Sequence, residues 1–82
     1  MIRGYVLIET EVGATLAVGD AVRAIRSEYG TIVSVDTVTG PYDVIVLVEA
    51  ADLDLLGKTI MHEVSPVAGV QRTTTCLSVN LA

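Results

Sequence analysis

The segment Asp43–Ala50, DVIVLVEA, constrains the fold of this chain more than any other stretch. Side chains alternate across a β-strand, so its three valines would point to one face while Ile45 and Leu47 point to the other. The segment Tyr5–Ile8, YVLI, has the same two-sided apolar character. A strand that is apolar on both faces needs cover on both faces of its sheet.

Four strands and two helices are predicted, in the order βαββαβ, from apolar residues at helical spacing and from segments rich in β-branched residues. Gly40-Pro41 predicts the turn of a hairpin, Asp52 is a suitable N-cap for the second helix, and Ser65-Pro66 ends that helix. The predicted strands are Ile2–Glu9, Ile32–Thr39, Asp43–Ala50 and Val70–Leu81. The first predicted helix has its apolar face at Val18, Ala21, Val22 and Ile25, and it ends near Ser27–Tyr29, before Gly30 in a left-handed conformation. The second predicted helix has its apolar face at Leu53, Leu56, Ile60 and Val64.

This order contains two strand-helix-strand units, and right-handed crossovers place both helices on the same face of the sheet. We therefore predict an α+β, ferredoxin-like sandwich, in which a four-stranded antiparallel sheet carries two helices on one face. The central strands of that fold are the two that are apolar on both sides. Much protein surface is somewhat apolar, but patches of this extent are rare on monomers, so we expect a second copy to cover the open face in a dimer through the sheet.

The length indicates one small domain spanning residues 1–82. A net charge of −5, five scattered basic residues and only 4% aromatic residues disfavour direct nucleic-acid binding. No segment has the length of a membrane span or the pattern of a signal peptide, so we expect no membrane partner and a cytoplasmic location. Cys76, the only cysteine, is expected to be a small buried hydrophobic residue.

The sequence predicts no catalytic residue, no metal site and no cofactor. His62 is the only histidine, it lies off the apolar face of the second helix, and Glu63 next to it cannot face it on that helix. No nucleophile elbow, dinucleotide fingerprint or phosphate loop is present.

Two local features are more informative. The turn Thr39–Asp43 carries an amphipathic ring and a carboxylate, which hairpin geometry alone does not require. In the last strand, Thr73 and Thr75 fall on one face, where their hydroxyls could bind a ligand or pair across an interface.

The segments YVLIETE, VTGPYDVIVLVEAADL and VAGVQRTTTCLSV together resemble the effector-binding domain of the Lrp/AsnC family of feast/famine transcription regulators, also called the RAM domain. The resemblance extends from about Ile2 to Val79. Two motifs carry the resemblance: a Gly-x-Tyr-Asp turn before an apolar strand, and a later Gly-Val-x-Arg-Thr-x-Thr segment. Together they are fairly specific for this family, whereas either motif alone would be a weak signal. The chain looks like a stand-alone form of this domain, residues 1–82, with no DNA-binding domain, since it lacks the helix-turn-helix domain of the full regulators.

The resemblance implies a ferredoxin-like fold and dimers that assemble into octamers or similar rings, with amino-acid effectors bound between dimers. An amino acid would offer its ammonium to Asp43 and to carbonyls of the turn, and its carboxylate to backbone N–H groups and threonine hydroxyls. Pro41 stands at the variable turn position and removes one N–H donor. The ligand-binding residues implied are Gly40, Pro41, Tyr42, Asp43, Thr73 and Thr75, with Val38 as an apolar wall.

Our leading hypothesis is a non-enzymatic, homo-oligomeric module that binds an amino-acid effector and modulates transcription through full-length Lrp/AsnC-type partners. One alternative is a purely structural oligomerisation module without a ligand. The other is a small enzyme of the dimeric α+β barrel type, which should have a polar pocket between sheet and helices. The sequence places valine, isoleucine, leucine and alanine in that layer instead.

Overall fold

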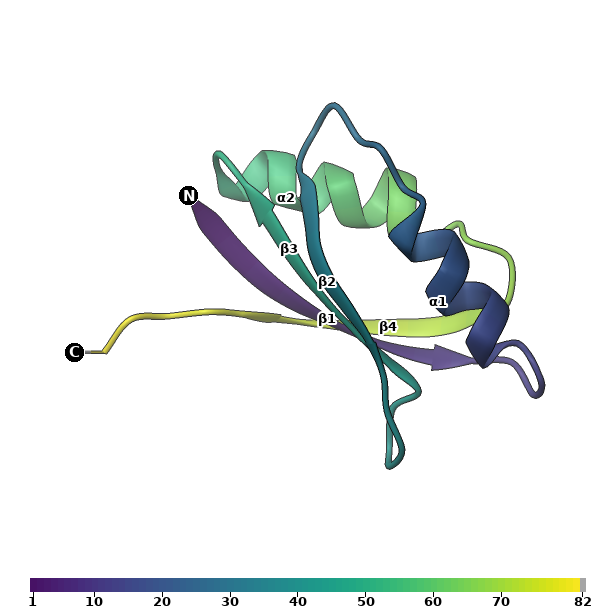
Figure 1. Ribbon diagram of the computed structural model, residues 1–82. Coiled ribbons are helices and arrows are strands. Elements are labelled where there is room, and N and C mark those ends of the chain that lie inside the picture. Colours follow the sequence, from purple (N-terminus) through teal and green to yellow (C-terminus); the bar gives the residue numbers. More distant parts are fainter. Residues whose placement is uncertain (82) are drawn as a thin grey trace.

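A computed structural model describes residues 1–81 of the chain, and it has the predicted architecture: four antiparallel strands form one sheet, and both helical segments lie on the same side of it (Figure 1). The sheet has the strand order β2-β3-β1-β4, which makes β3 and β1 the central strands. The elements are β1 (Ile2–Thr10), α1 (Thr15–Arg23), β2 (Thr31–Thr37), β3 (Val44–Ala50), α2 (Leu53–Thr59), which continues as the π-helical turn η1 (Ile60–Val64), and β4 (Val70–Leu77).

The core lies between the sheet and the helices. Antiparallel pairing sets Val6 of β1 opposite Val46 of β3, and Ile8 opposite Val44, so the inward residues of the two central strands form a continuous apolar row. Residues of α1 and of the α2–η1 segment cover this row. The fully or almost fully buried apolar residues are Val6, Ile8, Val18, Val22, Val44, Val46, Val48, Ala50, Leu56, Ile60 and Val64.

The first helix is shorter than its apolar pattern predicts. It ends at Arg23, and the amides of Ala24 and Ile25 then bond to carbonyls three residues back, which tightens the final turn. Ile25 still packs against the core from this turn. A periodic apolar residue can therefore reach the core from just beyond the end of a helix.

Gly30 does not have the left-handed conformation that we predicted, because the glycines with positive φ in the described chain are Gly13, Gly40 and Gly69. Its role is steric instead. A Cβ atom at Gly30 would lie 2.5 Å from Thr59 Oγ1 and 2.7 Å from the carbonyl oxygen of Glu49. The absence of a side chain lets the chain pass between α2 and β3.

The second helix begins and ends where the sequence predicts. Asp52 is the N-cap, and its Oδ1 accepts a hydrogen bond of 2.8 Å from the amide of Leu55. At the other end, the amide of Ser65 bonds to the carbonyl of Ile60 at 2.8 Å, which is the i→i+5 bond of a π-helix. The apolar spacing of this segment does not indicate the widened turn.

The last strand ends at Leu77, four residues earlier than predicted. Leu77 pairs with Gly4, and the amide of Ser78 then donates to the carbonyl of Arg3 at 2.9 Å. Little of β1 is left beyond that point to pair with, so residues 78–81 continue past the sheet as an extended tail (Figure 1).

The N-cap provides a test of this helix boundary. Replacing Asp52 with alanine removes an acceptor for an otherwise unpaired helix N–H, and we expect a loss of about 1 kcal/mol in the free energy of unfolding, measured by urea titration. Asp52→Asn keeps an acceptor and should unfold close to wild type. Equal losses in the two variants would contradict the capping role.

Candidate functional site

The face of the sheet opposite the helices is apolar at its centre. Cross-strand pairing places Tyr5 opposite Leu47 and Leu7 opposite Ile45 on this side. Tyr5 is 42% exposed, and the other three are half-buried without any element packed over them. We call these four residues the open-face patch. Its members are those that the two-sided strand pattern predicted.

Charged residues border the open-face patch. Arg3 forms an ion pair with Glu49 at one end of β1, and Arg72 forms one with Glu9, at 3.3 Å, at the other. An apolar centre with a polar rim is the usual anatomy of a protein–protein interface. These two rim pairs are formed within the chain. Asp36 of β2 stands opposite Ile45 on the same face and forms no ion pair within residues 1–81, so its carboxylate has to stay at the solvated edge when the patch is covered.

Cys76 also lies on this face, because it pairs with Tyr5 across β1 and β4. The prediction that it is buried was wrong for the single chain, in which Cys76 is exposed. The physical reason is that β4 is an edge strand, so its outward side chains have a neighbouring strand on one side only.

The turn between β2 and β3 is held to the end of β1 through Asp43. The amide of Val38 donates to the carbonyl of Asp43 at 2.9 Å and closes the turn, in which Gly40 has φ 137°. Asp43 Oδ2 accepts hydrogen bonds from the amide of Thr10 at 2.8 Å and from the Thr10 hydroxyl at 3.1 Å. The Thr10 hydroxyl is also 2.8 Å from that of Thr15, the first residue of α1. This carboxylate therefore joins β3, β1 and the start of α1.

The predicted site residues fall into two groups. Gly40, Pro41, Tyr42 and Asp43 lie together in the turn at the start of β3, with Gly40 and Pro41 exposed and the other two half-buried. Thr73 and Thr75 belong to β4, on the far side of β1, where they pair with Ile8 and Val6. The two groups are thus two strand spacings apart, about 10 Å. Within residues 1–81 no hydrogen bond joins them.

Thr75 lines an apolar groove of about 410 Å³ that runs between α2 and the outer edge of the sheet. Gly57 lies in this groove, and a Cβ atom there would have no heavy atom within 4 Å. We call this surface the α2–β4 groove. Its lining residues are Leu53, Leu56, Gly57, Ile60, Met61, Thr75 and Leu77. The sequence did not reveal it, because the rotation of α2 over the sheet decides which residues border it.

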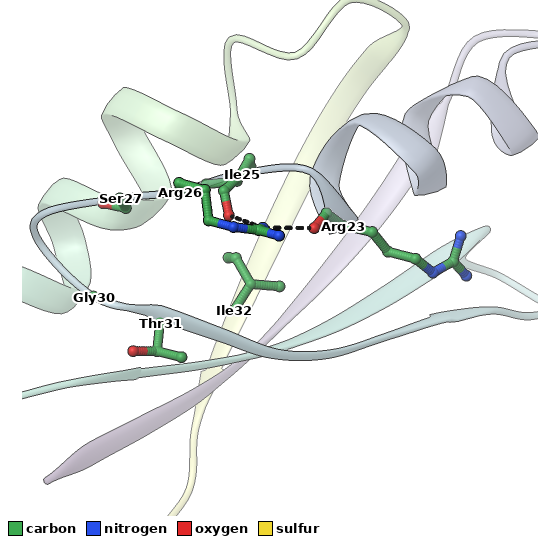
Figure 2. Close-up of a pocket in the computed structure, with 7 residues that line it drawn as sticks. All are labelled: Arg23, Ile25, Arg26, Ser27, Gly30, Thr31 and Ile32. Atoms are coloured by element: carbon green, nitrogen blue, oxygen red, sulfur yellow. Dashed lines mark hydrogen bonds between the residues drawn. The ribbon is translucent and has the colours of Figure 1, made fainter.

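A second depression, of about 480 Å³, lies where α1 leads into β2, and two arginines border it. Figure 2 shows Arg26 folded back onto the end of α1, where its guanidinium donates to the carbonyls of Arg23 and Ile25 at 3.2 and 3.0 Å. The Arg23 guanidinium points away from the depression and bonds to Asp20 and to the carbonyl of Val35. Both side chains therefore have structural partners and do not form an anion site.

The layer between sheet and helices holds one buried polar residue among residues 1–81, Thr59, whose hydroxyl donates to the carbonyl of Leu55 at 2.9 Å. His62 is exposed, with its ring 5.7 Å from that of Tyr29. In the described chain, no cluster of three or more His, Cys, Asp or Glu side chains has the arrangement of a metal site. None of the helices there is long and apolar enough to cross a membrane.

Comparison with protein families identifies one match: the family model described as the Lrp/AsnC ligand binding domain covers residues 3–81. Direct comparison with curated protein sequences finds no match. The resemblance noted in the sequence is thus found independently, over almost the same residues.

Solved structures similar to this chain include two of about its own length. The structure of TTHA0845 from Thermus thermophilus is 30% identical, with a TM-score of 0.86, and the alignment covers 100% of this chain and 98% of that one. FFRP-DM1 is 25% identical, with a TM-score of 0.84 and coverage of 96% and 100%. The transcriptional regulator NMB0573 from Neisseria meningitidis, solved in complex with L-Met, is 13% identical, with a TM-score of 0.80, and the match covers 98% of this chain and 51% of the regulator.

The contact between Asp43 and Thr10 predicts a stability difference between two substitutions. Asp43→Ala leaves the partly buried amide of Thr10 without an acceptor, while the Thr10 hydroxyl keeps Thr15 as its partner. We therefore expect a loss of about 1–3 kcal/mol in urea unfolding and faster hydrogen exchange at the Thr10 amide. Asp43→Asn keeps an acceptor oxygen and should lose clearly less. Alanine and asparagine variants that both behave like wild type would show that the contact contributes nothing.

Proposed function

The chain belongs to the Lrp/AsnC ligand-binding domain family, and we propose that it is a non-enzymatic, oligomeric effector-binding module that senses an amino acid. The family match over residues 3–81 carries this proposal. The complex of the similarly folded Neisseria meningitidis regulator with L-Met supports an amino acid as the class of effector.

In this proposal the functional unit is a dimer in which two open-face patches pack against each other. An isologous interface pairs the same patch of both subunits about a two-fold axis, and an apolar patch can pack against its own copy in this way. Its apolar side chains gain from being removed from water at about 25 cal/mol per Å². A chain of 82 residues has a small core, so this burial is a substantial part of its stability.

We place the effector at the turn, with its ammonium near Asp43. One carboxylate oxygen of Asp43 is occupied by Thr10, which leaves Oδ1 and the exposed backbone of Gly40 and Pro41 for the ligand. Tyr42 supplies a ring at the side. These groups belong to one short turn, so they can contact one small zwitterion together.

We assign the hydroxyl donors for the effector carboxylate to Thr73 and Thr75 of a neighbouring subunit, because within one chain these residues lie two strand spacings from the turn. A site shared between subunits couples ligand binding to assembly, with each favouring the other.

The response would reach DNA through a partner, such as a full-length regulator of the same family. The chain has ten acidic residues against five basic ones, so neutralisation of phosphates by this chain is weak. If this chain and such a regulator assemble through the same sheet face, effector binding to this chain would alter the assembly of the DNA-binding protein.

The proposed dimer predicts the effect of a charge in the patch. Leu47→Lys would bring like charges together across the two-fold axis, and we expect the dimer dissociation constant to rise at least about 100-fold in analytical ultracentrifugation. Leu16→Lys changes an exposed leucine on α1, and it should leave the dimer intact. A Leu47→Lys protein that still sediments as a dimer would place the interface elsewhere.

Effector binding predicts a thermal response to one or a few of the twenty amino acids. A ligand at a hundred times its dissociation constant adds about 2.7 kcal/mol to the native state. Asp43→Asn, which keeps the acceptor for Thr10 but removes the charge, should abolish the shift while its own stability stays close to wild type. If no amino acid changes melting or assembly mass, the structural oligomerisation module becomes the better description.

A further inference from the structure

We propose that the α2–β4 groove receives the C-terminal tail, residues 78–81, of a second copy of this chain. This contact is separate from the open-face patch, since the groove lies on the helical side of the sheet. Thr75 is the one proposed effector-binding residue that lines this groove.

The groove exposes apolar side chains to solvent and has open space between them. Three of its apolar side chains are strongly exposed in the single chain: Leu53 at 59%, Met61 at 70% and Leu77 at 49%. Gly57 between them contributes no side chain and leaves open space. Apolar side chains gathered along one groove, rather than scattered singly, mark an interaction site.

The tail has complementary features. It continues the strand pattern of β4, with Val79 and Leu81 alternating with Ser78 and Asn80, and the two apolar residues are 71% and 90% exposed. Four extended residues span about 13 Å. The nine residues of helix from Leu53 to Met61 rise by about the same length. The described part of the tail is thus long enough to lie along the groove, and its alternating apolar residues suit the apolar wall.

The tail cannot fill the groove of its own chain while the sheet is intact. The Ser78 amide is bonded to the carbonyl of Arg3, which keeps the chain running along β1 and out of the domain (Figure 1). Leu77, directly before the tail, is itself part of the groove wall. To enter this groove in its own chain, the tail would have to reverse direction within one residue.

The position of the groove makes exchange between two copies geometrically simple. The groove follows the outer edge of β4, which is the last strand of the sheet. Two chains that approach each other edge to edge about a two-fold axis would each extend a tail toward the groove of the other. Together with the open-face dimer, a second two-fold contact generates assemblies larger than a dimer.

Sedimentation of tail variants tests this contact. The double variant Val79→Ser with Leu81→Ser should reduce the wild-type assembly to the open-face dimer, and Met61→Lys should have the same effect from the groove side. The matched control is Val12→Ser with Leu16→Ser, which changes two exposed apolar residues elsewhere, and it should sediment like wild type. Tail and groove variants that also sediment like wild type would overturn the proposal.

Cross-linking identifies the occupant. In a Cys76→Ser background, chains carrying Met61→Cys are mixed with chains carrying Leu81→Cys, and oxidation should yield a disulfide between the two, identified by mass spectrometry. Chains carrying Val12→Cys in place of Leu81→Cys should not form this link with Met61→Cys. Absence of the tail-to-groove disulfide overturns the proposal. So does a single chain carrying both cysteines that closes an intrachain disulfide in preference to the link between chains.

Discussion

The pairing of β1 with β3 is the constraint on which the rest of this structure depends. Each of these strands carries apolar side chains on both faces, and the register aligns them so that each face of the sheet has its own apolar row. The helices cover one row completely, with Val6, Val44 and Val46 fully buried. The opposite row remains at the surface of the chain, and both the position of its charged rim and the exposure of Cys76 follow from that arrangement.

The faces of the strands could be predicted from the sequence because side chains alternate between the two faces of a strand with a period of two. The helix caps and the ends marked by Asp52 and Pro66 were also readable, since they depend on local chemistry. Gly30 was misinterpreted because a glycine before a strand is equally compatible with a left-handed turn and with close packing. Only the tertiary structure, which brings Thr59 next to it, decides between the two.

The candidate site was predictable in its parts but not in its arrangement. The turn residues are neighbours in the chain, and the structure keeps them together at one end of β3. That Asp43 binds Thr10 could not be predicted without the pairing register, because the two are 33 residues apart. The separation of the turn from Thr73 and Thr75 follows from the strand order, in which β1 lies between β3 and β4. The α2–β4 groove depends on how α2 is rotated over the sheet, and periodicity alone does not specify this rotation.

The double use of Asp43 has a mechanistic consequence. The same carboxylate that would attract an ammonium group also holds the end of β1 and, through Thr10 and Thr15, the start of α1. A ligand that binds the Asp43 carboxylate would therefore affect the residues that hold the end of β1. The outer face of β1 carries part of the open-face patch. Glu9, the residue before Thr10, belongs to the rim of that patch. In the proposed dimer, a change at the turn would therefore reach the subunit interface through two adjacent residues. Under the proposed function, coupling between effector and assembly would require no long pathway, because the register shift between Glu9 and Thr10 lies where the turn meets the rim of the patch.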